Sequence, residues 1–228
     1  MSGRRRSSPG PSSDLRQQLA DEAARLMAEH GIQDFSMAKR KAAERLRVRS
    51  SEGALPSNAQ IQERLVERLR IFEPDDVHDR RLEKLRLVAS DVMGVLDGFR
   101  PKLVGSVLDG TATVNSPIEL HVFSDSPEAV AAALEARGLR LRDSQRRYRF
   151  GREETTEIPG YDLMVDDEEL QVMVFPERGP RHSPLSPIDG KPMRRASRSA
   201  VLALLEPAAS DSPDSSDSSD RGRGAEGL

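Results

Sequence analysis

The chain has 228 residues, of which 36% are hydrophobic and 32% charged, with a formal net charge of -3 at pH 7. This balance favours one or two domains with a modest core beside disordered segments, and it excludes attraction to nucleic acid through bulk charge, leaving only local basic patches. Cysteine and tryptophan are absent, so disulfides and cysteine-based zinc sites are excluded and the core must be aliphatic. With no apolar run long enough for a bilayer and no signal-peptide pattern, we expect a soluble, cytoplasmic protein.

The N-terminal part is predicted to be helical after a disordered start. Residues 1–13 are rich in Arg, Ser, Pro and Gly and carry too few apolar side chains to fold. Residues 14–74 are predicted to form a helical module, whose first helix is capped by Asp14 and stopped by Gly31. A second helix begins after a Ser36 cap, and a third follows it.

Residues 75–176 are predicted to form an α+β domain that begins with a long helix ending near Gly98. The further elements are strands at 102–107 and 116–123, a helix at 128–137, an Arg-rich extended segment at 139–150, and a hairpin of 161–165 with 170–175. Residues 177–206 then form a basic, Pro-rich strap that ends in a short helix. The acidic, low-complexity tail at 207–228 is predicted to be disordered.

One stretch carries the strongest functional signal. Residues 103–123 read LVGSVLDGTATVNSPIELHVF, an apolar run that ends in Gly105-Ser106, a small-residue turn, and an alternating strand. This stretch resembles the signature of the nucleotidyltransferase superfamily related to DNA polymerase beta. The resemblance implies that the backbone of Gly105 and the hydroxyl of Ser106 bind a phosphate of a nucleoside triphosphate. Glycine allows close backbone approach to such an anion.

The metal-binding signature of that superfamily is altered. The superfamily carries an Asp-x-Asp pair on the strand after the Gly-Ser loop, and here Pro117 and Glu119 stand in its place. The superfamily adds a third carboxylate on a later strand, for which Asp162 is the candidate and Gln171 the uncharged alternative. The resemblance therefore implies Mg²⁺ held by Glu119 and Asp162, which would also be the catalytic residues. His121 follows on the same strand face but is a poor magnesium ligand.

Basic residues gather in the segment 139–152. Strand alternation places Arg147 and Arg149 on one side, and Arg146, Tyr148 and Phe150 on the other. Arginine forks suit phosphate and aromatic rings stack on bases, so Arg147 and Arg149 are candidates for binding a triphosphate or RNA. The alternative is a solvated face whose arginines pair with the acidic turn at 166–169. A second basic cluster follows in the strap, at Lys191, Arg194, Arg195 and Arg198.

The N-terminal helices offer another binding hypothesis. Residues 22–36 resemble the first helix and turn of TetR-type DNA-binding domains, and Lys39, Arg40 and Lys41 begin the next helix. The resemblance ends after Val48, where that family needs a tight turn and a recognition helix. Three hypotheses follow: a divergent Mg²⁺-dependent nucleotidyltransferase, an inactive nucleotide-binding or regulatory module, and a nucleic-acid-binding protein that uses the N-terminal helices and the Arg-rich strand.

Overall fold

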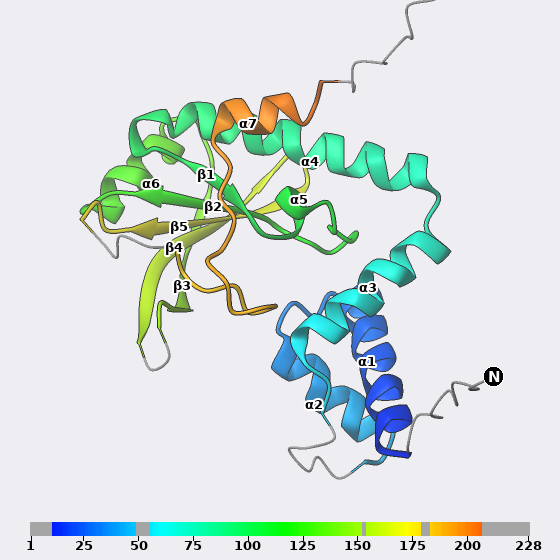
Figure 1. Ribbon diagram of the computed structural model, residues 1–228. Coiled ribbons are helices and arrows are strands. Elements are labelled where there is room, and N and C mark those ends of the chain that lie inside the picture. The colour runs from blue at the N-terminus through cyan, green and yellow to red at the C-terminus, as the bar shows by residue number, and fades with distance from the viewer. Residues whose placement is uncertain (1–10, 49–54, 152–153, 179–182, 207–228) are drawn as a thin grey trace, which may run out of the picture.

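The computed structural model describes residues 11–48, 55–151, 154–178 and 183–206 (Figure 1). Residues 1–10 and 207–228, which the sequence predicts to be disordered, lie outside these ranges, as does Arg152. The N-terminal module consists of α1 (Pro11–His30), α2 (Phe35–Arg45) and α3 (Asn58–Phe72). Because α1 begins at Pro11, the last three residues of the segment predicted to be disordered are helical.

The helical module has its own aliphatic core and defined helix starts. Its buried side chains come from all three helices and include Leu19, Leu26, Phe35, Ala38, Ile61 and Leu65. Asp34, and not Ser36, caps α2, since its carboxylate accepts the N–H of Met37 at 2.6 Å. Ser57 and Gln60 form a capping box at the start of α3. The cap of α2 therefore lies two residues earlier than predicted, and the helix gains an aromatic side chain for the core.

The described residues from Asp75 onward form the predicted α+β domain, together with the strap and its short helix. Its elements are α4 (Asp75–Val95), a 3-10 turn (Asp97–Phe99), β1 (Lys102–Val104), α5 (Gly105–Asp109), β2 (Ile118–Phe123), α6 (Pro127–Glu135), β3 (Leu141–Arg149), β4 (Thr155–Val165), β5 (Glu168–Phe175) and α7 (Arg198–Ala203). The sheet order is β1-β2-β5-β4-β3, in which β2 and β5 are parallel and the other neighbours antiparallel. The α+β fold class is thus confirmed.

The strand boundaries differ most from those predicted at the end of β1 and at the start of β4. Strand β1 stops at Val104, three residues early, because Gly105 adopts a φ of 73° and turns the chain into α5. Strand β4 begins at Thr155 instead of residue 161, and it pairs with β3 along its whole first half despite Pro159. The short β1 brings the Gly-Ser turn directly over the start of β2, where Val104 pairs with Glu119.

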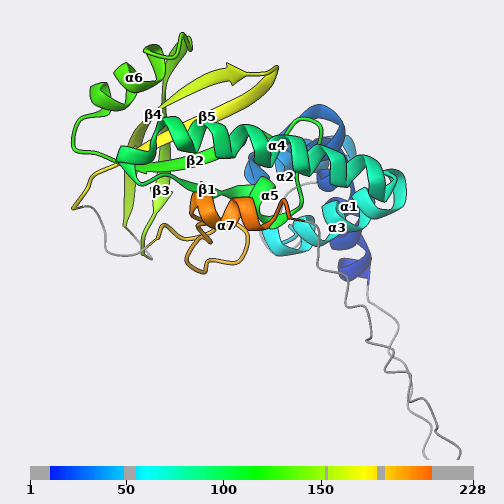
Figure 2. The same cartoon turned by 90° about the horizontal axis from the view of Figure 1, so that it is seen from above.

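The two faces of the sheet differ in character. Helices α4 and α6 cover one face, where they bury the side chains of Ile118, Leu120 and Val122 (Figures 1 and 2). The opposite face, which we call the open face, carries Glu119, His121 and Phe123 of β2 together with their register partners on β5, β4 and β3. A smaller aromatic cluster covers part of it, formed by Phe123, Tyr148, Phe150, Ile158, Met173 and Phe175.

The strap and the helical module meet at the end of the sheet that carries α5. The described part of the strap, residues 183–197, runs from β3 toward β1, where Leu103 and Ala196 form a bridge. In Figure 1 its turn lies between the sheet and the helical module. Asn58 of α3 donates to the backbone oxygen of Pro187 at 2.6 Å, which ties the module to this turn. Among the described helices, none combines the length and apolar character needed to cross a membrane.

Candidate functional site

A cleft of about 960 Å³ lies where the helical module, α5, β3 and the strap meet. Its walls include Gly105 and Ser106 of α5, Glu119 at the start of β2, and Arg146 and Arg149 of β3. The loop at residues 110–117, which connects α5 to β2, borders the same space, as does the α1–α2 connection. All four nucleotide-binding residues predicted from the sequence, Gly105, Ser106, Arg147 and Arg149, therefore line one cleft with Glu119.

The backbone of Gly105 and the side chain of Glu119 are in close contact. The φ of Gly105 is 73°, in the left-handed region that side chains other than glycine rarely adopt. A Cβ atom built on Gly105 would overlap Oε2 of Glu119, so the carboxylate lies directly against the glycine backbone. The glycine thus admits the Glu119 side chain at the place where the sequence predicts a phosphate.

Glu119 of β2 is paired with an arginine of β3, the strand at the far edge of the sheet. Its Oε1 accepts a hydrogen bond from Arg146, and the two side chains form an ion pair that is partly shielded from water. The same guanidinium donates to Oε1 of Gln33 in the helical module at 3.3 Å. Arg146 therefore places a fixed positive charge in the cleft, next to Gly105 and Ser106.

Asp162 lies on the same face of the sheet as Glu119 but two strands away, with β5 between them. Glu119 is opposite Gln171 on β5, and Gln171 is opposite Asp162 on β4. Paired residues of neighbouring strands share a face, so an amide separates the two carboxylates. Asp162 accepts a hydrogen bond from Arg142 at 2.9 Å and does not border the cleft. Each of the two predicted metal ligands is thus held by its own arginine.

The side chains at this position do not fit a magnesium site of the superfamily type. Such a site needs at least two carboxylates that share one ion. Pro117 offers no side-chain ligand, Gln171 is uncharged, and Glu119 is bound to Arg146. Within the part of the chain that the structure describes, no cluster of three or more His, Asp or Glu side chains is placed to hold a metal ion. The positive charge beside Glu119 comes from a guanidinium.

His121 is part of a buried polar chain on the open face. Arg195 of the strap donates from Nε to Nδ1 of His121 at 3.3 Å, and Nε2 of His121 lies 3.2 Å from Oη of Tyr148. Since an arginine only donates, Nδ1 must accept and Nε2 must carry the proton. Burial, with the positive charges of Arg195 and Arg146, holds the pKa of His121 well below its usual range. His121 is a neutral connector between the strap and β3.

Tyr148 and Arg195 complete this wall of the cleft. Burial, reinforced by the negative charge of Glu119, raises the pKa of Tyr148, so its phenol stays neutral. Arg195 stacks 5.2 Å from the ring centres of both Phe123 and Phe175. Sequence reasoning did not select Arg146, Tyr148 or Arg195 as site residues. The available sequence signal was strand alternation, which places Arg146 and Tyr148 on the face opposite to that of Arg147. The structure of β3 has the same arrangement.

The two predicted phosphate-binding arginines have different environments. Arg147 is ion-paired with Glu157 of β4 at 2.8 Å. Arg149 is exposed, forms no ion pair with any other described residue, and lies near the strap turn at Gly190. The alternative in which these arginines pair with the acidic turn is not what the structure shows, since Glu168 pairs with Lys84 at 2.5 Å. Arg149 is therefore the more available cation at the cleft.

The basic residues of the N-terminal module lie elsewhere. Arg40 and Lys41 are exposed on α2, and Lys39 is half-buried beside them. None of the three borders the cleft, which the module reaches through the α1–α2 connection and one side of α3. The nucleic-acid hypothesis for these residues thus concerns a surface separate from the cleft.

Comparisons with known proteins give a partial structural similarity. No protein-family model matches the chain, and no curated protein matches it. One similar solved structure is a cytoplasmic RNA terminal U-transferase, 21% identical with a TM-score of 0.29 over 44% of this chain and 30% of that chain. A second is the Cid1 poly(U) polymerase, 20% identical with a TM-score of 0.27 over 44% of this chain and 31% of that chain. The chain thus spans less than a third of either protein, and each similarity covers less than half of its own length.

Proposed function

We propose that the protein binds a nucleoside triphosphate in the cleft and neutralises its phosphates with arginine side chains in place of a carboxylate-bound metal ion. The observation that carries this proposal is the ion pair between Arg146 and Glu119 beside Gly105 and Ser106. A guanidinium at this point supplies the charge that a metal ion would otherwise supply, and it presents planar donors suited to phosphate oxygens.

The cleft has the size and chemistry of a small-molecule site. Its volume of about 960 Å³ lies within the range common for such sites. Arg149 and Arg194 border it on the side of the strap, and Ser106 adds a hydroxyl that can donate to an anion. Arg194 is also paired with Asp109 at 2.9 Å, which fixes its position. Tyr148 offers an aromatic surface for a base.

Nucleotidyl transfer is not part of this proposal. In-line displacement at phosphorus depends on metal ions that neutralise the attacking and leaving oxygens. The described donors do not form such a site, since the two carboxylates are held apart by Gln171 and bound by separate arginines. The inactive nucleotide-binding or regulatory module is therefore the function that the geometry supports best.

Replacing Arg149 with alanine is expected to weaken triphosphate binding about tenfold, the loss typical of one charge-assisted contact to phosphate. Titration calorimetry with each of the four nucleoside triphosphates, in EDTA, gives the dissociation constant. Arg142→Ala is the matched control, because Arg142 lies on the same strand, pairs with Asp162 and does not border the cleft. Equal affinities of the two variants, or binding that requires Mg²⁺, would contradict the proposal.

A further inference from the structure

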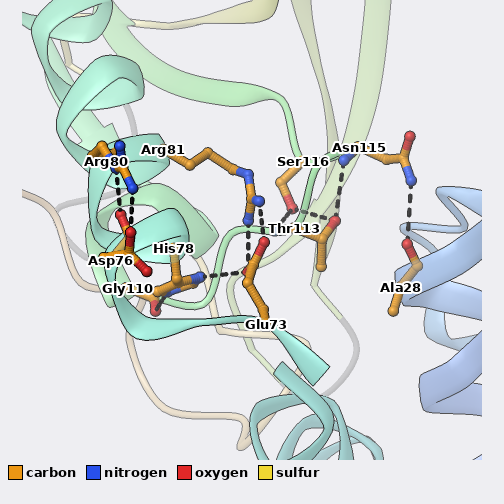
Figure 3. Close-up of polar contacts among 10 residues, drawn as sticks. All are labelled: Ala28, Glu73, Asp76, His78, Arg80, Arg81, Gly110, Thr113, Asn115 and Ser116. Carbon is orange, nitrogen blue, oxygen red and sulfur yellow. Dashed lines mark hydrogen bonds and ion pairs between the residues drawn. The ribbon is translucent and has the colours of Figure 1, made fainter. Parts of the chain in front are cut away.

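His78 joins the junction of α3 and α4 to a loop that borders the cleft. It lies in the first turns of α4, and its Nδ1 is 3.0 Å from Oε2 of Glu73 at the end of α3. Its Nε2 is 3.0 Å from the backbone oxygen of Gly110, the first residue of the 110–117 loop (Figure 3). One imidazole thus connects the α3–α4 junction to the loop that follows α5.

Both partners of His78 are hydrogen-bond acceptors. A backbone carbonyl only accepts, and an ionised carboxylate only accepts. The pKa of Glu73 is lowered by its hydrogen bond from Arg81 and further by His78, so Glu73 is ionised at neutral pH. A neutral imidazole carries one N–H and therefore turns a lone pair toward one of the two oxygens. The doubly protonated ring satisfies both contacts.

The charged groups around His78 are few and placed asymmetrically. From the end of α3 comes Glu73, and from α4 comes Arg81, which donates to the same carboxylate oxygen at 2.8 Å. Arg86, also on α4, lies near Gly110 and donates to the backbone oxygen of Val107 at 3.3 Å. From α5 comes Asp109, whose carboxylate is paired with Arg194. Arg81 keeps Glu73 in place whether or not the imidazole is protonated, so the contact to Gly110 is the one free to change.

The 110–117 loop is held at both ends. His78 holds its first residue, and near its other end Asn115 donates to the backbone oxygen of Ala28 in α1 at 3.2 Å (Figure 3). Within the loop, the hydroxyl of Ser116 accepts the N–H of Thr113 at 2.9 Å. This loop borders the cleft. A change at the His78 end therefore acts on one wall of the site.

We propose that His78 is a proton-controlled latch, which in its imidazolium form fastens the α3–α4 junction to the 110–117 loop and on losing its proton releases that end of the loop. The effect of the latch on ligand affinity rests on the proposed nucleotide function. The change that the latch makes in the 110–117 loop is independent of that function.

Hydrogen–deuterium exchange of the loop tests the latch directly. After correction for intrinsic exchange rates, opening at residues 110–113 is expected to increase about tenfold in the wild type between pH 6 and pH 8, the loss of one charge-assisted hydrogen bond. In His78→Gln the opening is expected to be independent of pH, because a glutamine amide neither gains nor loses a proton between pH 6 and pH 8. His30→Gln, at the exposed end of α1, is the matched control and should behave as the wild type.

Identical pH dependence in the wild type and in His78→Gln would overturn the latch. If the variant fails to fold, nitrogen-15 spectra of the wild-type ring decide: two ring N–H signals at pH 6 and one at pH 8 support the proposal, and one signal at both overturns it. Triphosphate affinity at the two pH values then separates the two proposals. A pH-dependent loop without triphosphate binding would reject the nucleotide function alone, and binding with a pH-independent loop would reject the latch alone.

Discussion

Replacing Gly105 with alanine is expected to lower the free energy of unfolding by about 2–4 kcal/mol, since a left-handed backbone and an overlapping Cβ atom each carry a cost. The φ of this residue is 73°, and the new methyl group would displace the carboxylate of Glu119 from its place beside Arg146. Urea denaturation at pH 7 measures the loss.

A matched control separates the two contributions. Gly138 has a φ of 77°, and no atom lies within 4 Å of the place that a Cβ atom would take, so Gly138→Ala carries only the backbone cost, about 1–2 kcal/mol. Combining Gly105→Ala with Glu119→Ala should reduce the effect of the alanine at position 105 to the same value. Equal losses in the two single variants would show that Glu119 does not lie against Gly105.

The second large effect is a loss of stability in mild acid caused by His121. Its pKa in the folded state is held well below the usual range by burial, and then by Arg195 and Arg146. Because the unfolded chain takes up this proton first, the contribution of His121 to stability is complete above about pH 6.5 and is lost as the pH falls, with a slope of about 1.4 kcal/mol per pH unit.

Urea denaturation at several pH values measures this slope. His121→Gln is the informative variant, since its amide oxygen can accept from Arg195 and its amide nitrogen can donate to Tyr148 without titrating. As the pH falls, the free energy of unfolding of this variant should decrease less steeply than that of the wild type. The difference in slope should be about 1.4 kcal/mol per pH unit, the value for one proton. His30→Gln should retain the wild-type slope, because His30 is exposed. Parallel curves for the wild type and His121→Gln would contradict this account, because they would mean that the folded and unfolded states bind the His121 proton equally well.

Much of the fold follows from local patterns in the sequence. The alternation of Ile118, Leu120 and Val122 predicts a strand with one buried face, and the structure buries that face under α4 and α6. The boundary of β1 was wrong because a short apolar run gives no sign of where Gly105 turns left-handed. The first half of β4 was missed because Pro159 disfavours a strand, yet β3 pairs with it along its length.

The sequence predicted many of the residues of the candidate site, but it did not predict which charged side chains pair with one another. The Gly-Ser motif locates the turn, and alternation along β3 separates Arg146 from Arg147. Which arginine meets which carboxylate depends on the order and register of strands far apart in the sequence, and no local pattern contains that information. Thus Glu119 meets Arg146, 27 positions later in the chain, and Asp162 meets Arg142. The metal-ligand roles of these carboxylates remain predictions from the resemblance.

The arginine pairing also explains why the altered Asp-x-Asp pair is consistent with a folded, charged cleft. A lone carboxylate in this partly shielded place needs a positive partner, and Arg146 provides it from β3. Removing Arg146 should therefore destabilise the ionised carboxylate of Glu119 more than loss of an arginine partner destabilises an exposed carboxylate elsewhere in the protein. Removal of the charge of Glu119 has opposite expected effects on triphosphate affinity in the two leading hypotheses, which are binding of the phosphates by arginines and binding through a Mg²⁺ ion held by Glu119.

The triphosphate affinity of Glu119→Gln, measured by calorimetry in EDTA and in Mg²⁺, distinguishes the two hypotheses. If arginines hold the phosphates, the variant should bind about threefold to tenfold more tightly in both buffers, because a negative charge is removed and Arg146 is released from a partly exposed ion pair. Asp162→Asn, away from the cleft, should leave the affinity unchanged. Weaker binding by Glu119→Gln, seen only in Mg²⁺, would contradict arginine-based binding and identify Glu119 as a metal ligand.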